Sequence, residues 1–98
     1  MALEITSRHI RVVKATKEHV RGKVERILEE FPWVENIHVI LDGQRHNQIA
    51  EVVVQGKRHV RLEATAVADE LFKAVDLAVE KMEKQLLKVS KKMQERRP

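Results

Sequence analysis

The 98-residue chain contains no cysteine, which excludes disulfides, zinc–thiolate sites and thiol catalysis. Its three glycines are scattered and form no phosphate-binding loop, and no segment rich in Gly, Pro or Ser separates two domains. No apolar run approaches the ~18–20 residues of a membrane span. The first ten residues include Glu4, Arg8 and His9, which is not the pattern of a signal peptide. We therefore expect one cytoplasmic domain over residues 1–98, with no membrane partner.

Charge is abundant and unevenly distributed. The chain has 19 Lys and Arg against 15 Asp and Glu, a formal charge of +4. The segment 81–97 holds seven basic residues against Glu83 and Glu95, a local net of +5, so the remainder nets −1. A near-neutral body with a basic C-terminal segment predicts a polyanionic partner, with nucleic acid favoured over a membrane surface.

Four segments alternate apolar and polar residues, which is typical of strands with one covered and one solvated face. They are Leu3–Thr6, Ile37–Asp42, Ala50–Gln55 and Val60–Thr65. The pair Asp42 and Gly43 predicts the turn that ends the second segment.

Two further segments have helical spacing. In the first, Thr16 is the expected N-cap, Glu18 lies in the first turn, and the helix ends at Phe31 before Pro32. The second runs from about Val67 to Gln94, with apolar residues three and four apart.

The resulting order is β-α-β-β-β-α. The first strand, first helix and second strand predict a parallel crossover, and the remaining strands predict an antiparallel meander. We expect an α+β domain in two layers, with a four-stranded mixed sheet and both helices packed on one face. A last helix of about 27 residues would be ~40 Å long, so its basic end should extend beyond the sheet.

The best candidate site is a basic surface on the two helices. At ~100° per residue, five lysines of the last helix share the side opposite its apolar stripe. In the first helix, Lys23 and Arg26 lie along one side, and the two basic stripes could line a common groove. The alternative is an ordinary solvated helix surface whose C-terminal lysines are favoured by the helix dipole. The five lysines are Lys81, Lys84, Lys88, Lys91 and Lys92.

Only three aromatic residues are present: Phe31, Trp33 and Phe72. We expect Phe31 and Phe72 in the core and Trp33 as a packing residue beside Pro32. None falls on the predicted solvated sheet face, which argues against base stacking on a sheet platform. Lysine and arginine without such aromatics predict phosphate contacts and recognition of shape.

Catalysis has little support in the sequence. The five histidines include no pair at metal-ligand spacing, and Ser7 and Ser90 have no evident base partner. We expect no catalytic residue, metal site, cofactor or small-molecule substrate.

The last helix, from Asp69-Glu70-Leu71-Phe72 through Ala74-Val75-Asp76 to Lys84-Gln85-Leu86, resembles the signature of the ribosome hibernation promoting factors. This family is also known as ribosome-associated inhibitors or sigma-54 modulation proteins. The strand Ala50–Val54 that leads to Gly56 is similar to the family's third strand, and the two preceding strands also match. The resemblance covers nearly the whole chain.

The resemblance implies a bacterial stationary-phase or stress factor with the same fold and no enzymatic activity. Such proteins bind the small ribosomal subunit and its RNA in the channel for messenger and transfer RNA, and they inhibit translation. The matching basic positions are Lys23, Arg26, Lys81, Lys84, Lys88 and Lys92. Val89 and Ser90 depart from the family pattern, which often has an aromatic residue or His followed by Lys.

The chain resembles a short form because it lacks the separate dimerisation domain of the long forms. A short form would need another hibernation factor to pair ribosomes. A piece of a long form would have the same sequence.

Two other functions remain open. One is a protein-interaction module that modulates a transcription factor, sigma-54. The other is a generic domain that binds double-stranded RNA, since such domains share the order helix, three strands, helix. Ala68-Asp69-Glu70 stands where those domains carry a basic cluster.

Overall fold

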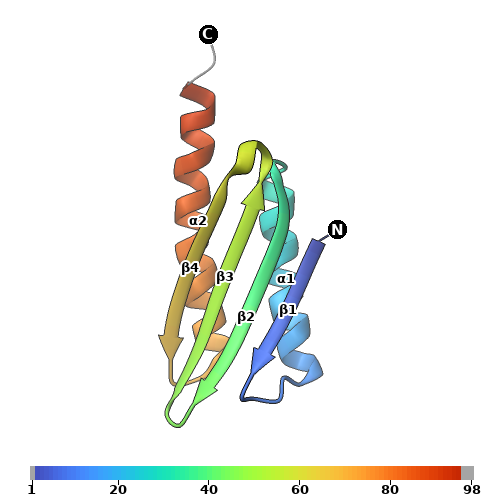
Figure 1. The fold of residues 1–98 in the computed structure, drawn as a ribbon, viewed down its shortest axis with the longest axis vertical. Coiled ribbons are helices and arrows are strands. Elements are labelled where there is room, and N and C mark those ends of the chain that lie inside the picture. Colours follow the sequence, from blue (N-terminus) through green and yellow to red (C-terminus); the bar gives the residue numbers. More distant parts are fainter. Residues whose placement is uncertain (1, 96–98) are drawn as a thin grey trace.

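The computed structural model describes residues 2–95 and has the predicted order of elements. These are β1 (Ala2–Arg8), α1 (Lys14–Glu30), β2 (Val34–Gln44), β3 (Asn47–Gly56), the short 3-10 helix η1 (Lys57–His59), β4 (Arg61–Ala68) and α2 (Leu71–Glu95). The sheet order is β1-β2-β3-β4, with β1 parallel to β2 and the other pairs antiparallel. Figure 1 shows both helices on one face of the sheet. The two-layer α+β fold is confirmed.

The apolar residues at alternate positions of the strands form one side of the core. In β2, Ile37, Val39 and Leu41 are almost fully buried, and Val52 and Val54 of β3 lie opposite them. From the other layer, each helix contributes a stripe of buried residues to the same cluster. The apolar faces of sheet and helices are therefore removed from water together, which is the main driving force for this fold.

The turn predicted at Asp42 and Gly43 is wrong. Both residues belong to β2, which continues to Gln44 and pairs with Asn47, so the hairpin turns at Arg45 and His46. A Cβ atom at position 43 would clash with the side chain of Ile10. Gly43 therefore serves the close approach of a neighbouring segment within the strand and does not end the strand.

The predicted start of the first helix is also wrong. Helix α1 begins at Lys14 after Val13, and no side chain caps it. Thr16 is buried inside the first turn, and no acidic residue lies in that turn. The Thr16 side chain is therefore buried and does not act as the cap that the local pattern predicted.

Helix α2 begins later than predicted and reaches beyond the sheet. Val67 and Ala68 extend β4, where they pair with β3, and the helix starts at Leu71. Figure 1 shows its C-terminal part past the ends of the strands. The molecule measures 51 × 23 × 19 Å. The predicted overhang is confirmed, while Arg96 and Arg97 of the basic segment lie outside the described residues.

Candidate nucleic-acid interface

The five lysines predicted to share one side of α2 are all exposed. We call them the lysine face: Lys81, Lys84, Lys88, Lys91 and Lys92. Lys84, Lys88 and Lys92 follow one another at four-residue intervals, which places them ~6 Å apart along the helix axis. The buried stripe of α2, which includes Val75 and Val79, lies on the opposite side of the helix.

Lys81 differs from the other members because it contacts the sheet. Its Nζ donates a hydrogen bond to the carbonyl oxygen of Thr65, at 3.0 Å. One turn later, Gln85 Nε2 donates to the carbonyl oxygen of Glu63, at 2.8 Å. These two side chains occupy backbone acceptors of β4, an edge strand that would otherwise offer them to another chain. Lys81 therefore has a structural contact in addition to its charge.

The basic residues of α1 lie in a different setting. Lys23 is partly buried, and its Nζ is 3.7 Å from an oxygen of Asp76 on α2. The same carboxylate oxygen is 2.6 Å from His19 Nε2. Arg26, one turn beyond Lys23, is exposed. Asp76 thus partly neutralises the basic stripe of α1 at its contact with α2.

Phe72 was expected in the core but does not lie there. Its side chain is 41% exposed and stacks on the ring of His19, with centroids 4.4 Å apart and planes 3° apart. Phe31 is buried as expected, and Trp33 packs against the core, which confirms both predictions. Phe72 instead covers the contact between α1 and α2.

The structure does not bring the two basic stripes into one groove. Lys23 is directed to α2 at Asp76, whereas Lys81 reaches the other flank of α2, at β4. The predicted residues therefore form two groups, the lysine face on α2 and the pair Lys23 and Arg26 on α1.

A third basic group was missed by the reasoning from sequence. Lys57, Arg58 and His59 form η1, which connects β3 to β4, and all three are exposed. Arg58 and His59 have positive φ angles of 64° and 61°, an uncommon backbone conformation for residues other than glycine. Three consecutive basic residues between two predicted strands were the available signal.

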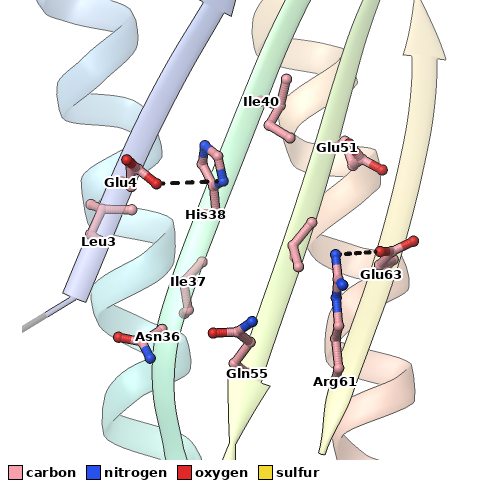
Figure 2. Close-up of a pocket in the computed structure, with 11 residues that line it drawn as sticks. Leu3, Glu4, Asn36, Ile37, His38, Ile40, Glu51, Gln55, Arg61 and Glu63 are labelled. Carbon is pink, nitrogen blue, oxygen red and sulfur yellow. Dashed lines mark ion pairs between the residues drawn. The ribbon is translucent and has the colours of Figure 1, made fainter.

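The open face of the sheet has a different character. A pocket of about 630 Å³ lies there. Figure 2 shows that side chains from all four strands line it. His38 lies between Thr6, at 2.8 Å from its Nε2, and Glu4, at 3.6 Å from its Nδ1. Arg61 is paired with Glu63 at 2.9 Å. Because carboxylates repel phosphates, this face is a poorer surface for a polyanion than the lysine face.

The described part of the chain offers neither a metal site nor a membrane-spanning helix. Within residues 2–95, no three His, Asp or Glu side chains come close enough together to hold a metal ion. Neither helix in that range combines the length and apolar character needed to cross a membrane.

Solved structures share this architecture. A ribosomal subunit interface protein from Coxiella burnetii superposes with a TM-score of 0.85 at 28% identity, covering 92% of this chain and 98% of that one. The N-terminal domain of Protein Y from Thermus thermophilus has the same fold, with a TM-score of 0.78 at 23% identity, covering 88% and 96% of the two chains. The chain therefore shares its fold with both of these proteins.

The chain belongs to the family described as Sigma 54 modulation protein / S30EA ribosomal protein, which matches residues 3–94. The ribosome hibernation promoting factor of Pseudomonas putida is 27% identical over 96 residues, covering 96% of this chain and 91% of that protein. Its counterpart in Escherichia coli K12 is 25% identical over 97 residues, covering 97% and 99%. The resemblance seen in the last helix is confirmed, and the chain is placed among ribosome-associated hibernation factors.

Proposed function

We propose that this protein is a non-enzymatic translation inhibitor that binds the small ribosomal subunit in the channel for messenger and transfer RNA. It acts in the cytoplasm as a single ribosome-binding domain. The lysine face of α2, together with Lys23 and Arg26 of α1, contacts the phosphates of ribosomal RNA.

The observation that carries this proposal is the exposed lysine face on a helix that reaches beyond its own sheet. An extension without a core beneath it gains little from folding, because it buries little apolar surface. Ribosomal RNA would supply the missing partner through phosphate contacts. The names of the relatives support a ribosomal partner.

Pairing of ribosomes is proposed to depend on another hibernation factor. The relatives named ribosome hibernation promoting factor have nearly the length of this chain, which supports comparison with a short form. A short form inactivates single ribosomes, and a second factor joins them.

Reversal of charge on the lysine face tests the proposal. The combined substitution of Lys84, Lys88 and Lys92 by Glu should abolish cosedimentation with purified small subunits, because three favourable charges are replaced by three unfavourable ones. All three side chains are exposed, so the fold should persist, and circular dichroism checks this.

A matched control makes the same change in charge elsewhere. Arg8, Lys14 and Arg45 are exposed and lie outside the proposed interface. Their combined substitution by Glu should leave most of the binding in place. Equal losses from both variants would show that net charge matters and the lysine face does not.

The second candidate is a module that modulates sigma-54, which the family's description mentions. Pull-down from a stationary-phase lysate separates the two functions. Ribosomal proteins and RNA are expected, whereas recovery of RNA polymerase components without ribosomes would support the alternative. A generic double-stranded RNA binder would instead bind arbitrary duplexes as tightly as small subunits.

A further inference from the structure

A hollow of about 660 Å³ lies near the end of the molecule from which α2 extends. Three segments surround it: α2, the connection between α1 and β2, and η1. Its apolar lining includes Trp33, Leu87 and Met93. Leu87 is 59% exposed, a large fraction for a leucine in the middle of a helix. The hollow is thus an apolar surface next to the basic overhang.

Trp33 lies in the connection between α1 and β2 and is held in place by contacts with α2, η1 and β3. Its Nε1 donates to Ser90 Oγ of α2 at 3.0 Å, and its carbonyl oxygen accepts from the Lys57 backbone N–H of η1 at 3.0 Å. The ring packs directly on Gly56, where an added Cβ would lie 2.7 Å from Trp33 Cε3. Trp33 therefore presents a fixed indole surface whose orientation does not have to be established on binding.

The rim of the hollow is mainly basic. Lys57 and Arg58 line it from η1, and Glu30 is its acidic residue. On α2, the exposed Lys91 directly follows Ser90, which lines the hollow. The site thus combines a planar apolar surface with cations within reach of it.

We propose that this hollow binds an unpaired RNA base, whose adjoining phosphates contact Lys57 and Arg58. A base stacks on apolar and aromatic side chains, and the polar groups of Ser90 and Gln94 can bond its edges. An apolar side chain of a protein would also fill the hollow, but it would leave the basic rim without a partner. The inference rests on the proposed function and adds a base contact to the phosphate contacts of the lysine face.

The fluorescence of Trp33 provides a direct test. The chain contains one tryptophan and no tyrosine, so intrinsic emission reports on this hollow alone. Hexauridylate should change the Trp33 emission saturably. An abasic chain of six ribose phosphates, with the same charge, should leave the emission unchanged. It should also bind at least about fivefold more weakly, since it loses the stacking contribution.

Substitutions of lining residues test whether hexauridylate binds in the hollow. Leu87→Ala and Arg58→Gln should each weaken hexauridylate binding about threefold or more, through a lost apolar contact and a lost phosphate contact. Leu77→Ala and Arg45→Gln are the matched controls and should have little effect. Leu77 is an exposed leucine of α2 outside the hollow, and Arg45 lies in the hairpin at the opposite end of the sheet.

Equal binding of hexauridylate and the abasic chain, with unchanged Trp33 emission, would overturn the inference. That result would not bear on cosedimentation with small subunits, so the proposed function is tested separately. A change in emission with small subunits but not with hexauridylate would show that the hollow does not bind an unpaired base by itself, and would also overturn the inference.

Discussion

Trp33 illustrates how single residues control the end of the molecule that carries the basic overhang. Its indole N–H, its carbonyl oxygen and its ring contact three different segments. The ring can approach β3 because residue 56 is glycine and has no side chain. The arrangement of α2, η1 and the start of β2 around Trp33 therefore depends on the absence of a side chain at Gly56.

Substitution of Gly56 by Ala should lower the free energy of unfolding by about 1–3 kcal/mol, as overpacking does elsewhere. The new Cβ would lie 2.7 Å from Trp33 Cε3 and 3.0 Å from the Trp33 carbonyl oxygen. That carbonyl is held by the Lys57 N–H, so the backbone cannot easily move away. Urea denaturation followed by Trp33 fluorescence measures the loss.

Gly22→Ala is the matched control and should have the opposite sign. Gly22 lies inside α1, and nothing is within 4 Å of an added Cβ. Alanine is favoured over glycine in a helix interior by up to about 1 kcal/mol, so this variant should be more stable than the wild type. A loss of stability in both variants would contradict the role given to the contact at Gly56.

At the scale of elements, α2 changes character between two consecutive leucines. Leu86 is 0% exposed and is the last fully buried residue of the helix up to Gln94, whereas Leu87 is 59% exposed. The preceding turns pack on β3 and β4, and the following turns carry Lys88, Lys91 and Lys92. One continuous helix thus serves as a core element in its first part and as a projecting basic arm in its second.

Leu86→Ala should cost about 2–5 kcal/mol of unfolding free energy, because it leaves a cavity in the core. Leu87→Ala should change stability by less than about 0.5 kcal/mol, as exposed substitutions generally do. Thermal and urea unfolding of the two variants measure the difference. Similar losses would show that the C-terminal part of α2 is packed in solution.

The edge of β4 shows a second contribution of α2. Lys81 and Gln85 bond the carbonyl oxygens of Thr65 and Glu63. Since an uncovered edge strand can pair with another chain, the side chains of α2 protect the sheet from such pairing. Lys81 thus combines a place on the lysine face with a structural role, so substitutions at Lys84 or Lys88 report on RNA binding more cleanly.

For the whole molecule, the two layers differ in charge. The open face of the sheet carries Glu4, Glu51 and Glu63 around His38, whereas the lysine face lies on the helical layer. A polyanion would be attracted to one side and repelled by the carboxylates on the other. The formal charge of +4 therefore understates the field at the proposed interface.

Binding to small subunits should weaken steeply with salt, because phosphate contacts release counterions. A plot of the logarithm of the association constant against that of salt concentration should be linear. Each substitution of Lys84, Lys88 or Lys92 by Ala should reduce the magnitude of its slope by about 0.7–0.9. A slope that is unchanged in all three variants would exclude these lysines from phosphate contact.

Much of the fold could be predicted because its patterns are local. Alternation gave the strands, the three- and four-residue spacing gave the helices, and the order of elements gave the mixed sheet. The errors occurred where long-range packing overrides local preference. Thr16 is buried instead of capping α1, and Gly43 lies within a strand because Ile10 packs against it.

Less of the candidate site than of the fold could be predicted from the sequence. The phase of a helix follows from the sequence, so the exposure of Lys84 and Lys88 could be anticipated. The partners of Lys23 and Lys81 could not, because Asp76 and Thr65 are distant in sequence from them and meet them only in the folded chain. The exposure of Phe72 depended likewise on a stacking partner, His19, in the other helix.

The sequence by itself determined the two-layer fold and a lysine-bearing side of the last helix. Both follow from the periodicity of apolar residues, which is a property of the chain within each element. Only the tertiary structure decided which basic residues lie near one another and that Trp33, η1 and α2 enclose a hollow. Those features depend on contacts between segments far apart in the chain, and the packing of the common core places these segments together.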